Sequence, residues 1–132
     1  MVSKVQRYIF NPTMDSPLRF IHPMQVKSVS RLLDEPFPDY IDYVILFGSS
    51  LDLTCGNGSD LDFYVISESD TDMVYKEFYD RCKALGKPFD IIVSTREDFS
   101  AESSVLGTVE NRIMQEGLCL YAKTQNNIAR TG

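Results

Sequence analysis

Three aspartates have the spacing and surroundings of metal ligands. Asp60 and Asp62 flank Leu61 in a short apolar run. Successive side chains of a strand point to opposite faces, so both carboxylates would share one face while Leu61 enters the core. Two carboxylates within roughly 7 Å of each other repel without a cation, and their oxygens suit a hard ion such as Mg²⁺. The same spacing also arises by chance, and an Asp at a strand edge is often only a solvated turn residue.

Asp90 has a similar setting. It lies in the run Phe89–Val93, where Phe89 and Ile91 flank it and would take the buried face. Asp is depleted from strand interiors, which sets this residue apart from an ordinary surface carboxyl. If the strand of Asp90 neighbours the strand of Asp62, three carboxylates converge. They would then form a two-metal site of the kind used for phosphoryl and nucleotidyl transfer.

A glycine-serine pair follows the apolar run Tyr43–Phe47. Backbone N–H groups at a turn through Gly48 and Ser49 can cradle phosphate oxygens, and the missing Cβ of Gly48 lets a ligand approach closely. The other interpretation of the same pair is an ordinary turn at the end of a strand.

Together these motifs resemble the DNA polymerase β-like nucleotidyltransferase superfamily. Gly48-Ser49, ten residues and then Asp60-Leu61-Asp62 form the pattern GSx10DxD, which is similar to its minimal nucleotidyltransferase branch. The match covers about residues 43–66 and extends to about residue 94. The resemblance implies that Gly48, Ser49 and Ser59 bind the nucleotide.

The resemblance also implies the chemistry. Asp60 and Asp62 would ligate both metals, Mg²⁺ or Mn²⁺, and Asp90 would ligate the catalytic metal and help to activate a hydroxyl. That hydroxyl would attack the α-phosphorus of a nucleoside triphosphate, which we expect to be ATP, and release pyrophosphate. Such minimal domains often work with a separate all-helical partner protein, and some act as antitoxins that modify a toxin.

One departure from the family pattern supports an alternative function. Family members often carry a basic residue soon after Gly-Ser, whereas Ser50–Thr54 contains none and includes Asp52. The alternative is a catalytically weak or inactive module of the same fold that binds a nucleotide or a protein. In an active enzyme, the positive charge would come from elsewhere, with Arg81, Lys87 and Arg96 as candidates.

The elements around these residues predict an α+β fold, in which a small mixed sheet is flanked by helices in one mixed α/β domain. Apolar spacing predicts helices over 24–35, 70–85 and 103–116, and strands over 43–47, 61–66, 89–93 and 118–121. Ser69 and Asp72 resemble a capping box for the second helix. Leu106, Val109 and Ile113 form the apolar stripe that predicts the third.

Length and composition limit the remaining possibilities. The 132 residues fit a single domain, with residues 1–23 forming an extended arm or a hairpin and 123–132 a polar tail. The net charge of −6 argues against long duplex nucleic acid as the main ligand. The three cysteines form no CxxC pair, so neither a disulfide framework nor a zinc site is expected. The absence of a membrane span and of a signal peptide predicts a cytoplasmic protein.

Overall fold

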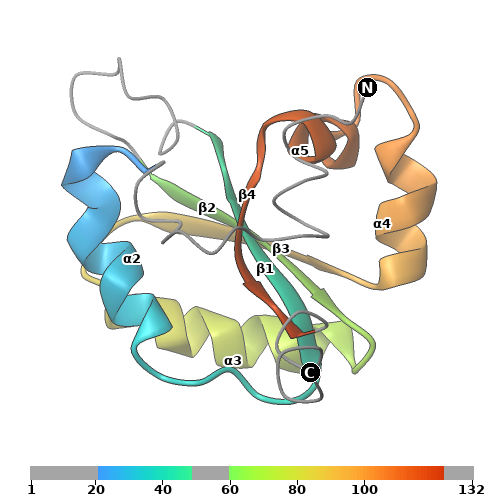
Figure 1. Cartoon of the computed structure of the whole chain (residues 1–132). Coiled ribbons are helices and arrows are strands. Elements are labelled where there is room, and N and C mark those ends of the chain that lie inside the picture. The colour runs from blue at the N-terminus through green and yellow to red at the C-terminus, as the bar shows by residue number, and fades with distance from the viewer. Residues whose placement is uncertain (1–20, 49–59, 124–132) are drawn as a thin grey trace, which may run out of the picture.

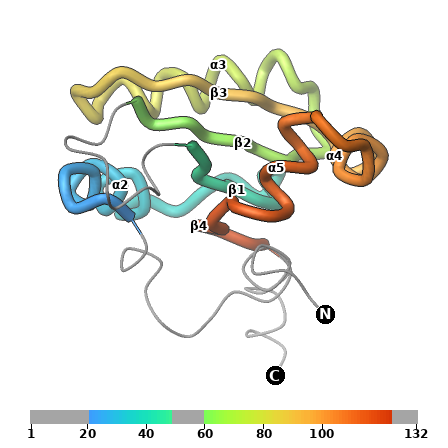
Figure 2. The backbone as a smooth tube through the Cα atoms, turned by 90° about the horizontal axis from the view of Figure 1, so that it is seen from above, coloured from blue at the N-terminus to red at the C-terminus, as the bar shows by residue number. Residues whose placement is uncertain are grey.

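The computed structural model describes residues 21–48 and 60–123, and its centre is a four-stranded mixed sheet (Figure 1). The strands are β1 (Ile41–Phe47), β2 (Leu61–Ser67), β3 (Phe89–Ser94) and β4 (Leu118–Ala122). Their order is β3-β2-β1-β4, and Figure 2 shows them side by side in this order. β1 is antiparallel to both β2 and β4, whereas β2 and β3 are parallel. The predicted small mixed sheet with flanking helices is confirmed.

The helices cover both faces of this sheet. They are η2 (Pro23–Gln25), α2 (Val26–Leu33), α3 (Thr71–Lys83), α4 (Arg96–Ser103) and α5 (Val109–Glu116). Phe63 and Tyr64 are successive residues of β2 and therefore point to opposite faces. Phe63 contacts Phe78 of α3, and Tyr64 contacts Phe99 of α4, with ring centroids 5.5 and 5.3 Å apart. In Figure 1, α3 accordingly runs below the sheet while α5 lies above it.

The predicted helix over 70–85 is present as α3, but its N-terminal cap is one residue later than expected. Asp70 is the capping residue, because its carboxylate accepts hydrogen bonds from the backbone N–H groups of Asp72 and Met73 at 2.9 and 3.4 Å. Val74 and Phe78 are buried, as the apolar stripe predicts.

The predicted helix over 103–116 is wrong in its first turns. α4 ends at Ser103, and α5 begins only after Thr108, whose side chain accepts a hydrogen bond from the N–H of Asn111 at 3.0 Å. Gly107 has a φ of 91°, which no helix contains, so the chain must break between the two helices. Leu106 is consequently 85% exposed instead of buried.

No helix of the described ranges is long and apolar enough to cross a membrane.

Candidate active site

The predicted carboxylates of β2 and β3 meet at one end of the sheet. Asp62 lies across from Phe47 of β1 on one side and across from Asp90 of β3 on the other. Residues that are directly opposite on neighbouring strands point to the same face, and the strands are about 4.8 Å apart. The structure therefore brings Asp62 and Asp90 together on the face of the sheet opposite α3.

Asp60 lies immediately before β2 and is exposed. Leu61 and Phe63 are completely buried on the opposite face, while Asp62 is partly buried and Asp90 is exposed. This alternation is the one expected from the sequence. It leaves the two strand carboxylates open to a ligand from the side of the sheet away from α3.

Gly48 directly follows the last residue of β1 and lies next to the side chain of Asp62. Its φ of 82° lies in the left-handed region, where glycine is favoured. A Cβ built on Gly48 would lie 2.4 Å from Oδ2 of Asp62, far inside the contact distance of two such atoms. Glycine at this position therefore makes room for the carboxylate itself. The other two predicted nucleotide-binding residues, Ser49 and Ser59, lie outside the described residues.

Negative charge accumulates around Asp62. Its partial burial raises the pKa of its carboxyl above the usual value for Asp, and the charges of Asp90 and Asp60 raise this pKa further. A bound cation would reverse this effect, because it favours the ionised form. The carboxylate oxygens suit a hard ion such as Mg²⁺. In the described part of the chain, however, no three His, Cys, Asp or Glu side chains already form a group that could hold one ion.

Two of the three basic residues considered as phosphate ligands are engaged away from this site. Arg81 of α3 donates hydrogen bonds to the carbonyl oxygens of Leu32 and Pro36, at 2.8 and 3.1 Å. Arg96 pairs with Asp42 at 3.4 Å. Arg96 follows β3 and Asp42 begins β1, so this ion pair lies at the opposite end of the sheet from Asp62.

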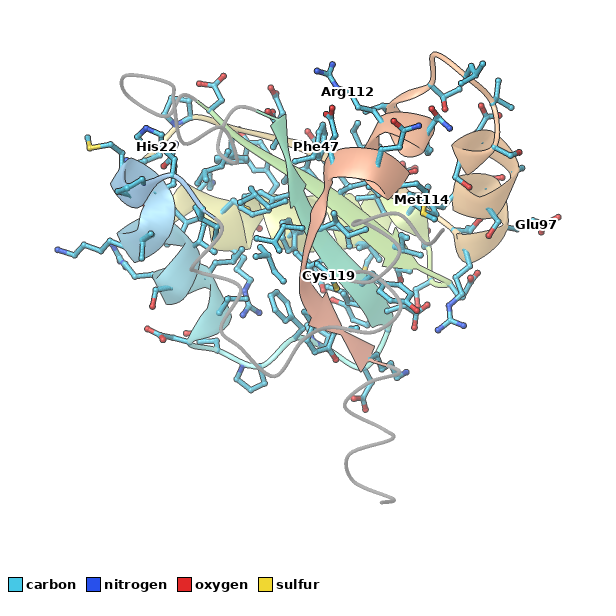
Figure 3. All side chains as sticks on the ribbon, turned by 45° about the horizontal axis from the view of Figure 1, so that its top comes forward. His22, Phe47, Glu97, Arg112, Met114 and Cys119 are labelled. Atoms are coloured by element: carbon cyan, nitrogen blue, oxygen red, sulfur yellow. The ribbon has the colours of Figure 1, made fainter. Side chains whose placement is uncertain are left out.

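Lys87 is nearer in the chain, three residues before Asp90, and its Nζ donates to the carbonyl oxygen of Met24 at 2.6 Å. Arg112 of α5 pairs with Glu116 at 3.0 Å and is largely exposed. Figure 3 shows Phe47 near the upper end of β1 and Arg112 standing out from the molecule above it. Arg112 therefore points away from the sheet.

Sequence reasoning missed a hydrogen-bonded cluster on the same face as Asp62. The hydroxyl of Tyr64 donates to Oε2 of Glu110 at 2.7 Å and shares a 2.7 Å hydrogen bond with Ser94. Burial raises the pKa of Tyr64 well above its usual value, so the phenol keeps its proton. The cluster joins β2, β3 and the first turn of α5 two residues from Asp62. The only signal in the sequence was Tyr64 itself, whose hydroxyl lies among the apolar residues that follow Asp62 in β2.

Comparison with solved structures finds two at low sequence identity. One is a mutant of the toxin–antitoxin MntA-HpeT, with 17% identity over 78% of this chain and 77% of that chain and a TM-score of 0.44. The other is the tri-AMPylated HEPN toxin of Shewanella oneidensis in complex with the MNT antitoxin. It has 18% identity over 80% of this chain and 78% of that chain and a TM-score of 0.43. No curated protein matches the chain.

A protein family described as nucleotidyltransferase domain matches residues 26–118. The matched region begins at α2, ends at the first residue of β4 and includes Gly48, Asp60, Asp62 and Asp90. It spans well over half of the sequence, and it confirms the resemblance drawn from the GSx10DxD pattern. The chain therefore belongs to the nucleotidyltransferase domain family, and its general activity is that of a nucleotidyltransferase enzyme.

Proposed function

We propose that this chain transfers AMP from ATP to a hydroxyl group of an acceptor, with Mg²⁺ or Mn²⁺ as the cofactor. The observation that carries the proposal is the position of Asp62, which lies directly across from Asp90 and against the α-carbon of Gly48. Two carboxylates on one face, next to a glycine with a positive φ, suit a metal-bound triphosphate better than a structural role.

Each site residue has a specific part in the proposal. Asp60 and Asp62 would hold the metal that arrives with the triphosphate, and Asp90 would hold the catalytic metal and orient the attacking hydroxyl. The metal would supply positive charge at the phosphates. The hydroxyl oxygen forms a bond to the α-phosphorus, the bond between this phosphorus and the bridging oxygen breaks, and pyrophosphate leaves while the hydroxyl proton passes to solvent. Gly48, with Ser49 and Ser59, binds the phosphates through the backbone and the hydroxyls.

The proposed acceptor is a hydroxyl on a separate protein, a small all-helical one. The resemblance to minimal nucleotidyltransferases supports this choice, because such domains often work with an all-helical partner and some act as antitoxins that modify a toxin. The described part of the chain also leaves few residues for a pocket around a small acceptor, since most of it forms the sheet and the helices that cover it.

Thermal melting tests the metal site. Mn²⁺ should raise the melting temperature of the wild type, because a ligand of the folded state alone stabilises by mass action and here also relieves repulsion. The double variant Asp60→Asn/Asp62→Asn should not respond. The matched control is Asp39→Asn, an exposed carboxyl near the other end of β1, which should respond like the wild type. Equal shifts in all three proteins would disprove the metal site.

The alternative is a protein of this fold that binds a nucleotide without transferring it. The engagement of Arg81 and Arg96 elsewhere favours it, because neither can then neutralise the triphosphate. Pyrophosphate release from ATP, measured with Mg²⁺ and the helical partner present, separates the two functions. Metal-dependent ATP binding with no pyrophosphate release would support the alternative.

A further inference from the structure

β3 is an edge strand with an open apolar side. Its only strand neighbour within the described ranges is β2, and Figure 2 shows it outermost in the sheet. β1 and β2 are almost entirely buried, whereas Phe89, Ile92 and Val93 of β3 are all partly exposed. The outer side of β3 therefore combines an unpaired strand edge with accessible apolar side chains.

This edge lacks the usual protection against pairing with another chain. Natural sheets protect their edges with lysine, proline or a β-bulge. The run Phe89–Ser94 contains no lysine and no proline, and its pairing with β2 is regular along its whole length. β4, the other edge strand, is irregular, because its register against β1 shifts between Val44 and Ile45. The only charge on β3 is Asp90, which belongs to the candidate active site.

Aromatic side chains of α3 lie beside this edge. Tyr79 is 41% exposed, and its ring packs edge-on against Phe89 at a centroid distance of 5.0 Å. Tyr75 continues the row one helical turn away, with its ring centroid 6.1 Å from that of Tyr79. Exposed tyrosines supply large contact areas at recognition surfaces, because they pair an apolar ring with a hydroxyl that tolerates water.

We propose that the outer edge of β3 binds the acceptor as an added strand and presents an acceptor hydroxyl to Asp90. This inference rests on the proposed function and adds the place and the chemistry of the acceptor. An added strand lies about 4.8 Å from β3, so its residue opposite Asp90 points to the face that holds Asp90 and Asp62. The residues on either side of it point to the other face, towards Phe89 and Tyr79.

The geometry specifies an acceptor of one chemical class. It is an extended polypeptide segment, which in an all-helical partner lies in a loop or a terminal tail outside the helices, with a Ser, Thr or Tyr whose two neighbours are apolar. A strand edge binds mainly through backbone N–H and C=O groups, which a sugar or another small hydroxyl compound lacks. The hydroxyl oxygen becomes bonded to the α-phosphorus of ATP, pyrophosphate leaves, and the proton passes to solvent.

Synthetic heptapeptides with a central Ser, Thr or Tyr between valines test this inference. They are incubated with ATP labelled at the α-phosphate and Mg²⁺, and label on the peptide is measured. Two further peptides carry N-methyl groups on one or the other alternating set of amides. An added strand turns only one of these two sets of amides towards β3. The peptide methylated on that set should lose at least about tenfold in kcat/KM, because several hydrogen bonds to β3 are lost. The peptide methylated on the other set should keep its kcat/KM. Equal labelling of all the peptides would overturn the proposal.

A pair of protein variants tests the same edge with an unmodified peptide. Val93 lies across from Val65 on the α3 face, away from the face of Asp90, so Val93→Lys charges the edge beside the acceptor. The expected result is a KM for the best peptide that rises at least about tenfold, with ATP affinity within twofold of wild type. Leu120→Lys is the matched control, since Leu120 is a partly exposed residue of the other edge strand, and its KM should stay within twofold. Equal effects of the two substitutions, or none from either, would overturn the edge proposal.

The outcomes separate this inference from the proposed function. Metal-dependent ATP binding with no label on any peptide overturns the acceptor edge and leaves the proposed function standing. Absence of metal-dependent ATP binding overturns the proposed function. If Val93→Lys does not fold, the two methylated peptides decide the question with the wild-type protein alone.

Discussion

Asp62 should make the stability of the metal-free protein depend on pH. Its pKa in the folded protein is raised above the ordinary value of 3.8, first by burial and then by Asp90 and Asp60. A carboxyl with a raised folded pKa stabilises the fold fully below its unfolded pKa, and this contribution is lost as the pH rises through the folded pKa. Without metal, Asp62→Asn should therefore melt higher than the wild type at pH 7, and the difference should shrink as the pH falls towards 3.8.

Melting curves of the two proteins between pH 4 and pH 7 in a chelating buffer would measure this effect. Asp39→Asn is the control, because it removes an exposed carboxyl at a distance from the cluster. If Asp62→Asn and Asp39→Asn change the melting temperature by the same amount at every pH, the charge cluster around Asp62 has no energetic effect.

Gly48→Ala should displace the Asp62 carboxylate. The new Cβ would lie 2.4 Å from Oδ2 of Asp62, and it would also strain a backbone with a φ of 82°. Gly86→Ala is a matched control, because Gly86 has a φ of 71° and a Cβ there would meet nothing within 4 Å. Both variants should lose roughly 1–2 kcal/mol of stability from the strain alone. Only Gly48→Ala should also weaken metal-dependent ATP binding, by about tenfold or more. Urea unfolding and ATP titration of both proteins measure the two effects, and equal ATP affinity in the two variants would contradict this role of Gly48.

At the scale of single residues, the sequence predicted the carboxylates better than their surroundings. The alternation of apolar and acidic side chains predicted that Asp62 and Asp90 each point away from the buried face of their own strand, because strand periodicity is a local property. That the two strands are neighbours was only a condition of the prediction, and it is the pairing of β2 with β3 that places both carboxylates on one face. The hydrogen bond between Tyr64 and Glu110 joins residues 46 positions apart. No local pattern reports such a pair, since it depends on how α5 packs on the sheet.

The helices are limited by side chains that hydrogen-bond to the backbone. Thr108 begins α5 by accepting from the N–H of Asn111, and its hydroxyl donates to the carbonyl oxygen of Glu102 at 2.7 Å. Thr108→Ala should therefore lower the free energy of unfolding by about 1–2 kcal/mol. Thr108→Ser keeps the hydroxyl and should recover most of the loss. Urea unfolding followed by circular dichroism measures both variants, and equal stability of the Ala and Ser variants would show that the cap contributes nothing.

The elements were predictable where apolar periodicity was strong. β2, β3 and α3 lie within a residue or two of their predicted bounds, because their buried side chains recur at strand or helix spacing. The α4–α5 region was not predictable in this way. Leu106 fits a helical stripe by its spacing alone, and yet it lies in the turn beside Gly107. A glycine with a positive φ and a capping threonine separate the two helices there, and the spacing of the apolar residues indicates neither.

The two ends of the whole sheet have different roles. The end of β1 and the starts of β2 and β3 bring Gly48, Asp62 and Asp90 together. The other end is closed by the Arg96–Asp42 ion pair and by a hydrogen bond from the backbone N–H of Arg96 to Glu68. The charges at that end are satisfied within the fold, whereas the carboxylates at the first end repel one another. Among the described residues, ligand binding is therefore expected at the end that holds Asp62 and Asp90.

Substitution of Asp90 should separate nucleotide binding from transfer in the whole enzyme. Asp60 and Asp62 are proposed to hold the metal that arrives with ATP, whereas Asp90 serves the catalytic metal and the hydroxyl. The effect of Asp90 should therefore be larger in the transition state than in the ground state. Asn is nearly the same size as Asp, and the side chain is exposed, so Asp90→Asn should fold normally.

The Asp90→Asn variant should bind Mg²⁺–ATP within a few-fold of wild type but transfer AMP at least about a hundredfold more slowly. A single-turnover assay with ATP labelled at the α-phosphate, with Asp39→Asn as the control, measures the difference. Transfer by Asp90→Asn at the wild-type rate would mean that the third ligand is a different carboxylate.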